Sequence, residues 1–251
     1  MNQIFDYKAA ATALTDKTIL VTGAGGGIGR AAAMAFSQHG ATVILTGSRA
    51  TPLEQTYDQM VAAGCREPAM ITFDLKNKDL EAYIEFANSI DRAFGKLDGV
   101  LHNASILGER KPIEQQTFSV WSEVMQVNVN SAMLMTKALM PLLRAASSAS
   151  IVLTSSGVGR QGRAYWGAYA VSKFATEGLM QVLADEMQNT SNIRVNSVNP
   201  GGTRTAMRQS AFPGESPENN PLPDEIMPVY LYLMSDDSAE VNGQALSAQI
   251  R

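Results

Sequence analysis

The sequence has few of the residues that form disulfides or bind metals, because its 251 residues include one cysteine, Cys65, and two histidines, His39 and His102. A single thiol cannot close an intrachain disulfide, and these three residues do not have metal-ligand spacing. Positive charge is also scarce, with 20 lysines and arginines against 24 aspartates and glutamates, a net charge of −4. An acidic balance argues against a nucleic-acid surface, which needs cations to neutralise phosphates. We therefore expect neither a metal site nor a nucleic-acid partner.

Long apolar runs are missing as well. No run approaches the length of a membrane span, and residues 1–16 contain no apolar segment behind a basic one, as a secretory leader would. These absences favour a cytoplasmic protein without a membrane partner. The length fits a single α/β domain, residues 1–251, with a full hydrophobic core.

Glycine is concentrated in the segment 18–30, TILVTGAGGGIGR. The apolar run 19–21 predicts a buried strand, and the alanine-rich run 30–36 predicts a helix. Glycines between them leave no Cβ where an anion approaches the backbone, and the N–H groups at the start of the helix face that anion. A flexible glycine-rich loop is the alternative, but the flanking strand and helix favour a dinucleotide site. Its expected cofactor contacts are Gly23, Gly25, Gly26, Gly27, Ile28 and Gly29.

Strand and helix patterns alternate along the rest of the chain, which predicts a doubly wound parallel sheet of the α/β class, with helices on both faces. We expect seven strands, at 19–21, 41–45, 69–73, 99–104, 150–156, 193–198 and 244–248. The helices are expected at 30–39, 52–64, 78–94, 120–145, 165–189 and 224–234.

The end of the second strand indicates the choice of cofactor. A carboxylate at this point binds the ribose 2′-hydroxyl of NAD, whereas a cation accommodates the 2′-phosphate of NADP. The segment 46–49, TGSR, has no carboxylate and offers Ser48 and Arg49. It therefore favours NADP over NAD, the alternative being that Arg49 is a solvated loop charge.

Other strand ends also carry candidate contacts, because ligands of an open parallel sheet bind at the carboxyl ends of its strands. We expect Asp74 and Leu75 beside the adenine, although Asp74 serves equally well as the cap of the next helix. Asn103, with Ala104, either fixes backbone carbonyls or contacts the cofactor ribose. His102 is expected to be packed rather than to act as a base, since no orienting partner lies near it in sequence.

Three side chains stand out in the long helices. Asn128 lies inside a helix, where asparagine is unfavourable, so it is either solvent-facing or kept for a purpose. Tyr169 and Lys173 are four residues apart and share one helix face. An ammonium about 4 Å from the phenol, at an effective dielectric of about 20, lowers a tyrosine pKa of about 10 by about 3 units. We therefore expect Tyr169 to titrate near neutrality, unless the two residues are an ordinary packing pair.

Taken in order, these segments resemble the compact, single-domain branch of the short-chain dehydrogenase/reductase family. Residues 22–29 are similar to its TGxxxGxG motif, residues 103–104 to part of NNAG, and residues 169–173 to YxxxK. Pro200 and Gly201 with Thr205 match PGxxxT, and Ser156, rather than Ser155, has the usual serine spacing of thirteen residues before the tyrosine. His102 and Ser105 depart from NNAG. Further segments, such as 99–104 and 199–207, resemble the YciK-type branch of bacterial oxidoreductases.

The resemblance implies a Rossmann fold and an oxidoreductase that transfers a hydride between NADP or NAD and a small or medium-sized carbonyl or alcohol. It implies that Tyr169 exchanges the substrate proton and that Ser156 binds the reacting oxygen. Lys173 then binds the nicotinamide ribose, and Asn128 holds a water that relays protons to it. The residues implied at the nicotinamide end are Pro200, Gly201, Thr203 and Thr205.

The family usually forms dimers or tetramers through its two long helices, here 120–145 and 168–189, so we expect a homo-oligomer. The proline-rich segment 206–223 is expected to be a mobile lid loop over the substrate, the alternative being a tolerated surface insertion. A non-catalytic nucleotide sensor or assembly protein of the same fold is the second class of function. The complete set of Asn128, Ser156, Tyr169 and Lys173 favours the enzyme.

Overall fold

The computed structural model describes residues 6–249. Within them, seven strands form one parallel sheet in the order β3-β2-β1-β4-β5-β6-β7, which confirms the predicted doubly wound fold in a single domain. The strands are β1 Thr18–Thr22, β2 Thr42–Gly47, β3 Ala69–Thr72, β4 Gly99–His102, β5 Ala149–Thr154, β6 Ile193–Asn199 and β7 Ala245–Ser247. The helices are α1 Gly27–Gln38, α2 Ala50–Ala62, α3 Leu80–Phe94, α4 Phe118–Met125, α5 Ser131–Ala145, α6 Gly167–Met187, α7 Ala206–Ala211 and α8 Met227–Met234.

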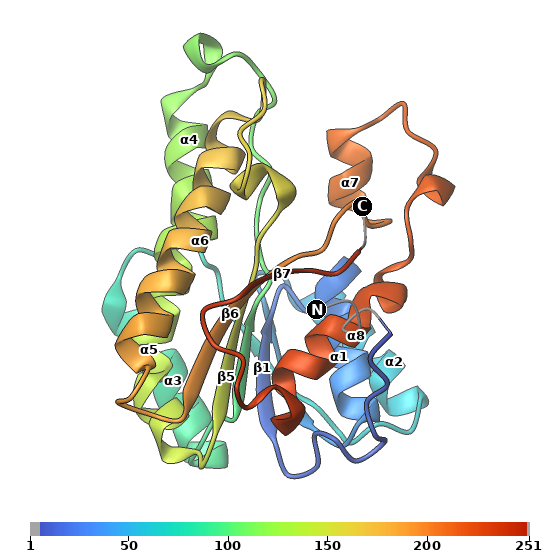
Figure 1. The fold of residues 1–251 in the computed structure, drawn as a ribbon, viewed down its shortest axis with the longest axis vertical. Helices are drawn as coiled ribbons and strands as arrows, with labels where there is room; N and C mark the ends of the chain where they lie inside the picture. The colour runs from blue at the N-terminus through green and yellow to red at the C-terminus, as the bar shows by residue number, and fades with distance from the viewer. Residues whose placement is uncertain (1–5, 250–251) are drawn as a thin grey trace.

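Helices cover both faces of the sheet, with α3, α5 and α6 on one side and α1 and α8 on the other (Figure 1). The strands are apolar on both faces because each face has its own core. Ile19 and Val21 of β1 pack with Phe36 of α1. Leu20 points the other way and joins Tyr83 of α3. This two-sided burial explains why the central strands read as continuous apolar runs in the sequence.

The helical run predicted at 120–145 is present, but it is not a regular α-helix. Helices α4 and α5 are joined by a π-helical segment, Gln126–Asn130, whose backbone stays right-handed helical on both sides. Asn128 lies in this segment and is 5 % exposed. Such π-segments inside α-helices are rare and are frequent at functional sites.

The segment 206–223 was expected to be a loop, and that expectation is wrong in part. Its first residues form α7, which Thr205 caps by accepting a hydrogen bond from the Arg208 N–H at 3.1 Å. A short 3-10 turn, Pro217–Asn219, follows. The cap explains the helix, because the threonine oxygen satisfies an amide that the first turn leaves unpaired. In the part of the chain that the structure describes, none of the helices combines the length and hydrophobicity that a membrane crossing requires.

Candidate functional site

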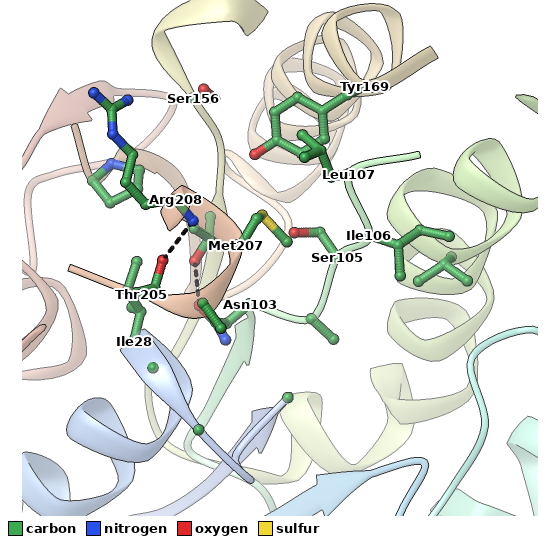
Figure 2. Close-up of a pocket in the computed structure, with 18 of the residues that line it drawn as sticks. Ile28, Asn103, Ser105, Ile106, Leu107, Ser156, Tyr169, Thr205, Met207 and Arg208 are labelled. Carbon is green, nitrogen blue, oxygen red and sulfur yellow. Dashed lines mark hydrogen bonds between the residues drawn. The ribbon is translucent and has the colours of Figure 1, made fainter. Parts of the chain in front are cut away.

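A cavity of about 630 Å³ opens at the carboxyl ends of the strands. Tyr169 reaches into it from α6, and Ser156 lies beside the tyrosine (Figure 2). The cavity brings together most of the predicted contacts: Gly23, Gly26, Gly27, Ile28, Ser48, Arg49, Asp74, Leu75, Asn103, Ala104, Ser156, Tyr169, Pro200, Gly201, Thr203 and Thr205. Four predicted residues do not line it: Gly25, Gly29, Asn128 and Lys173.

Two glycines of the turn serve packing rather than the cavity. A Cβ at Gly29 would lie 2.2 Å from the carbonyl oxygen of Gly23 and 2.7 Å from the Asn103 amide nitrogen. A Cβ at Gly25 would lie 2.8 Å from the Pro52 ring. Their lack of a side chain lets β1, α1 and α2 approach closely. Contact of either residue with the cofactor stays a prediction.

The cavity side of the turn is open to an anion. Gly26 is the N-cap of α1, provides no side-chain cap, and has space around the position where a Cβ would stand. Gly27 has a φ of +52°, in the left-handed region that favours glycine. The first amides of α1 therefore lack a side-chain acceptor at the cap, which is the arrangement that binds phosphate groups at helix N-termini.

At the end of β2, Ser48 and Arg49 lie on the cavity, and both are exposed. None of the ion pairs among residues 6–249 includes Arg49. Its guanidinium is therefore not neutralised by a carboxylate of the described chain and can meet an anionic group.

Asp74 lines the cavity and does not cap the next helix. Its carboxylate accepts a hydrogen bond from the backbone N–H of Lys76 at 3.0 Å. The cap of α3 is Asp79, which accepts from the Glu81 N–H at 3.1 Å. The capping alternative for Asp74 is wrong because the helix begins two residues later than its pattern indicated, at Leu80.

Asn103 fastens three strand ends together at the floor of the cavity. Its side-chain amide donates to the Thr22 carbonyl at 3.2 Å, and its carbonyl oxygen accepts from Thr154 at 3.4 Å. The Thr22 hydroxyl oxygen accepts from the backbone amides of Asn103 and Ala104. Because these amides bond to the Thr22 side chain and not to a neighbouring strand's backbone, β4 ends at His102 rather than at the expected residue 104.

His102 is packed in the interior, as its lack of an orienting partner indicated. Its Nε2 lies 2.9 Å from the Thr136 hydroxyl, and burial lowers the pKa of His102 to about 4. The ring is therefore neutral at pH 7.

Tyr169 is 8 % exposed, and burial raises its pKa to about 12, while the neighbouring Ser156 hydroxyl lowers it by a smaller amount. The prediction that the pKa of Tyr169 falls toward neutrality is therefore wrong. The Lys173 ammonium donates to the Thr154 carbonyl at 2.7 Å and lies 5.5 Å from the centre of the tyrosine ring. The sequence estimate counted the charge of the lysine and left out desolvation of the phenolate, which dominates here.

Lys173 and Asn128 lie behind the main cavity. Together they line a small polar cavity with Thr22, His102 and Thr154. Asn128 accepts from the Ile106 N–H at 2.8 Å and donates to the Ile106 carbonyl and the Ser172 hydroxyl, each at 3.0 Å. It is therefore buried and anchors the loop after β4. Burial lowers the pKa of Lys173 to about 8, against the opposing attraction of the Glu177 carboxylate.

The apolar end of the cavity was largely missed from the sequence. Trp166 lies with its ring centre 5.8 Å from that of Tyr169. Its spacing of three residues before Tyr169 was an available signal, because such residues are neighbours at a helix start. The loop and α7 positions carried no comparable pattern. Five lining residues come from the segment expected to cover the substrate: Ala206, Met207, Arg208, Ala211 and Phe212. The other unforeseen lining residues are Gly47, Phe73, Lys76, Ser105, Ile106, Leu107, Val127, Thr154 and Ser155.

Comparison with known proteins finds the same architecture and sequence pattern elsewhere. The family model for short chain dehydrogenase matches residues 17–216. The uncharacterized oxidoreductase YciK of Escherichia coli K12 is 51 % identical over 243 residues, 97 % of this chain and 96 % of that protein. Cyclohexanol dehydrogenase of an Acinetobacter species is 31 % identical, with 94 % of each chain covered.

Solved structures agree over the same length. One is a Shigella flexneri protein described as a short chain dehydrogenase and complexed with NADP. It is 51 % identical, has a TM-score of 0.93, and is matched over 96 % of this chain and 100 % of its own. Because the family model spans most of the sequence and the relatives match over nearly their whole length, this chain belongs to the short-chain dehydrogenase/reductase family of oxidoreductases.

Proposed function

We propose that this protein uses NADPH in preference to NADH to reduce a small or medium-sized carbonyl compound, and that it catalyses the reverse oxidation of the alcohol. The observation that carries the proposal is that one cavity holds both a helix-start anion site and the paired hydroxyls of Ser156 and Tyr169. The NADP bound to the Shigella relative supports the choice of cofactor.

The residues at the β1–β3 end fit the adenosine half of the cofactor. The open first turn of α1, at Gly26 and Gly27, would bind the pyrophosphate. Arg49, with Ser48, would meet the ribose 2′-phosphate, which NADH lacks. Asp74 and Leu75, which line the cavity, would lie beside the adenine.

The residues at the β4–β6 end fit the nicotinamide half. Asn103 and Ala104 lie on the cavity floor between the two halves. Lys173, directly behind Tyr169, would bind the nicotinamide ribose. The carboxamide end would meet the backbone and side chains of Pro200, Gly201, Thr203 and Thr205.

The chemistry of this chain's own residues is proton transfer. Bound NADPH supplies the hydride that the carbonyl carbon accepts. Tyr169 donates its phenolic proton to the carbonyl oxygen as the carbon–oxygen double bond becomes a single bond, and Ser156 donates a hydrogen bond to the same oxygen. The Lys173 ammonium stabilises the phenolate that forms, and Asn128 helps to hold the buried polar cavity through which the proton is replaced.

The pKa of Tyr169 fits a role as proton donor in the reduction. At about 12, it leaves the phenol protonated at pH 7, which is the form that donates a proton. Oxidation of an alcohol needs the phenolate, which costs more in this buried position.

The test is a panel of aldehydes, ketones and diones with NADPH and with NADH, followed by the absorbance of the reduced nicotinamide. We expect turnover with NADPH and a fall of at least about 100-fold in kcat for Tyr169→Phe, because general acids contribute about 10²–10⁴-fold. The NADPH dissociation constant should not change. Tyr165→Phe is the matched control, since Tyr165 is 58 % exposed and does not line the cavity. Cofactor binding without turnover on the whole panel would favour a nucleotide sensor instead.

We further propose that the segment 206–223 is a lid. Helix α7 contributes Met207 and Ala211 to the cavity wall, and Phe212 follows them. Hydrogen exchange of this segment should slow when substrate and cofactor bind together, and an unchanged rate would contradict a lid.

We also propose that the protein forms a homodimer or homotetramer through α4, α5 and α6. This face exposes large apolar side chains that a monomer would leave in water: Phe118, Met133, Val171, Phe174 and Val182.

A further inference from the structure

The substrate end of the cavity is apolar. The walls beside Tyr169 are formed by Ile106, Leu107, Trp166, Met207, Ala211 and Phe212. The one carboxylate among the lining residues is Asp74, which belongs to the adenine end. The part of the substrate that lies along this wall should therefore be mainly apolar, because a polar group there would lose its hydration and meet only the Ser105 hydroxyl and the Arg208 guanidinium, which is paired with Glu215.

Arg110 lies against this wall. It comes from the loop between β4 and α4, and its Cζ lies 4.5 Å from the centre of the Trp166 ring and 4.9 Å from that of Phe212. The two ring centres are 5.7 Å apart. Arg110 is not itself a lining residue, but it rests on two rings that are, so its guanidinium is held in place beside the cavity.

The charge of Arg110 distinguishes it from its cationic neighbours. Arg208 also stacks on Phe212, at 3.9 Å, but Glu215 accepts two hydrogen bonds of 2.6 Å from its guanidinium. Lys111 is paired with Glu109 at 2.8 Å. Throughout the described chain, no ion pair is formed by Arg110. The apolar end of the cavity thus has one cation whose planar donors are not taken by a carboxylate.

We propose that Arg110 is a specificity-determining residue that selects carbonyl substrates with an apolar body and a carboxylate at the far end. This inference rests on the proposed reductase function. A substrate that follows the Trp166–Phe212 wall outward from Tyr169 meets the guanidinium, which binds a carboxylate through two parallel N–H···O hydrogen bonds. The aromatic contacts orient Arg110 before the substrate arrives, so less freedom is lost on binding.

The test uses benzoyl-substituted straight-chain carboxylic acids of increasing chain length, each compared with its own methyl ester, in the presence of NADPH. Acid and ester share the ketone and the apolar body and differ in charge. For the best chain length, we expect kcat/KM for the acid to exceed that for the ester by about tenfold or more. Arg110→Gln should remove this preference while changing the value for the ester less than about twofold. Arg66→Gln, which removes an exposed arginine far from the cavity lining, is the matched control.

A purely structural role for Arg110 predicts a different result. If the residue only fastens its loop to Phe212, Arg110→Gln lowers the rates for acid and ester alike, and the proposal is overturned. Arg110→Lys, which keeps the charge without the planar fork, should retain part of the preference. An unchanged dissociation constant for NADPH shows that each variant is folded.

A second readout separates this inference from the proposed reaction. Binding of each acid and ester to the NADP-loaded protein is measured by calorimetry, whether or not it is turned over. Tighter binding of an acid that Arg110→Gln abolishes supports the proposal even if no probe is reduced. Equal binding of acids and esters, or no binding of any acid, overturns it. Failure of the reductase function itself shows separately, as silence across the whole carbonyl panel.

Discussion

Lys173 is a buried cation whose charge affects the stability of the folded protein and, in the proposed mechanism, its activity. It is 3 % exposed, and burial lowers its pKa from 10.5 to about 8. Between these two pH values the unfolded chain binds more protons than the folded protein, so the stability of the folded protein rises with pH in this window. Below pH 8 the protein carries the full cost of a buried ammonium. In the proposed mechanism this cost is retained because the ammonium stabilises the phenolate of Tyr169.

We therefore predict that Lys173→Met abolishes reduction yet raises the free energy of unfolding at pH 7, by roughly 1–3 kcal/mol. The advantage over the natural protein should shrink as the pH rises from 8 to 10.5. Chemical denaturation across this range measures both quantities. Lys137→Met, on the exposed face of α5, should show no such pH dependence, and a constant difference for Lys173→Met would rule out the argument.

In the turn between β1 and α1, Gly26 and Gly29 lack a side chain for different reasons. Gly26→Ala adds a Cβ into open space and keeps an extended backbone that any residue adopts, so the variant should fold. Its methyl group would stand where we propose that the pyrophosphate binds, and the affinity for NADPH should then fall at least tenfold.

Gly29→Ala is the contrasting change. Its Cβ would collide with the Gly23 carbonyl, a backbone atom that cannot move alone, and the variant should lose about 1–3 kcal/mol of stability or more. Thermal unfolding and NADPH titration of the two variants give opposite patterns under this prediction. Equal stability of the pair would contradict it.

The π-helical segment is an element that the loop after β4 depends on. Asn128→Ala leaves the partly buried amide and carbonyl of Ile106 without their side-chain partner, which costs about 1–3 kcal/mol. For a chain of this size we expect the melting temperature to fall by about 2–10 °C. Asn130→Ala, one half-turn on and exposed, should be nearly neutral in the same melting experiment. A similar fall in melting temperature for both variants would show that the segment is sensitive to any substitution, and would contradict a specific role for Asn128.

Most helices and strands could be predicted from the sequence because local hydrophobic periodicity and capping residues determine where they form. The seven strands, the glycine turn and the spacing from Ser156 to Tyr169 could all be predicted from the sequence. The π-segment could not, since its extra residue leaves the apolar pattern of a long helix almost unchanged. Helix α7 was missed because its short run among prolines has no periodic stripe, and its cap, Thr205, had been assigned to the cofactor.

Which residues line the site was easier to predict than the protonation behaviour of those residues. The strand-end residues converge because parallel strands end at one edge of the sheet. The pKa of Tyr169 depends instead on how deeply the phenol is buried, which no residue spacing reports. The same holds for Trp166 and Phe212, whose meeting with Arg110 joins three segments far apart in the chain.

For the whole molecule, the exposed apolar face of α4 and α6 predicts assembly. Phe118 is 80 % exposed, and Phe174 and Val182 are also uncovered. We expect a dimer or tetramer at micromolar concentration in sedimentation experiments, and Phe174→Glu should shift it to smaller species because a buried charge is costly. Leu222→Glu, at an exposed position outside these helices, is the control. A natural protein that sediments as a monomer would refute the prediction.

Helix α6, which lies with α4 and α5 on one side of the sheet (Figure 1), is part of the proposed interface and also carries Tyr169 and Lys173. If both proposals hold, this one helix links the subunit interface to the proton-transfer residues. If contacts from neighbouring subunits hold α6 in position, dilution below the dissociation constant of the assembly should lower turnover per active site. Specific activity would then report the degree of association.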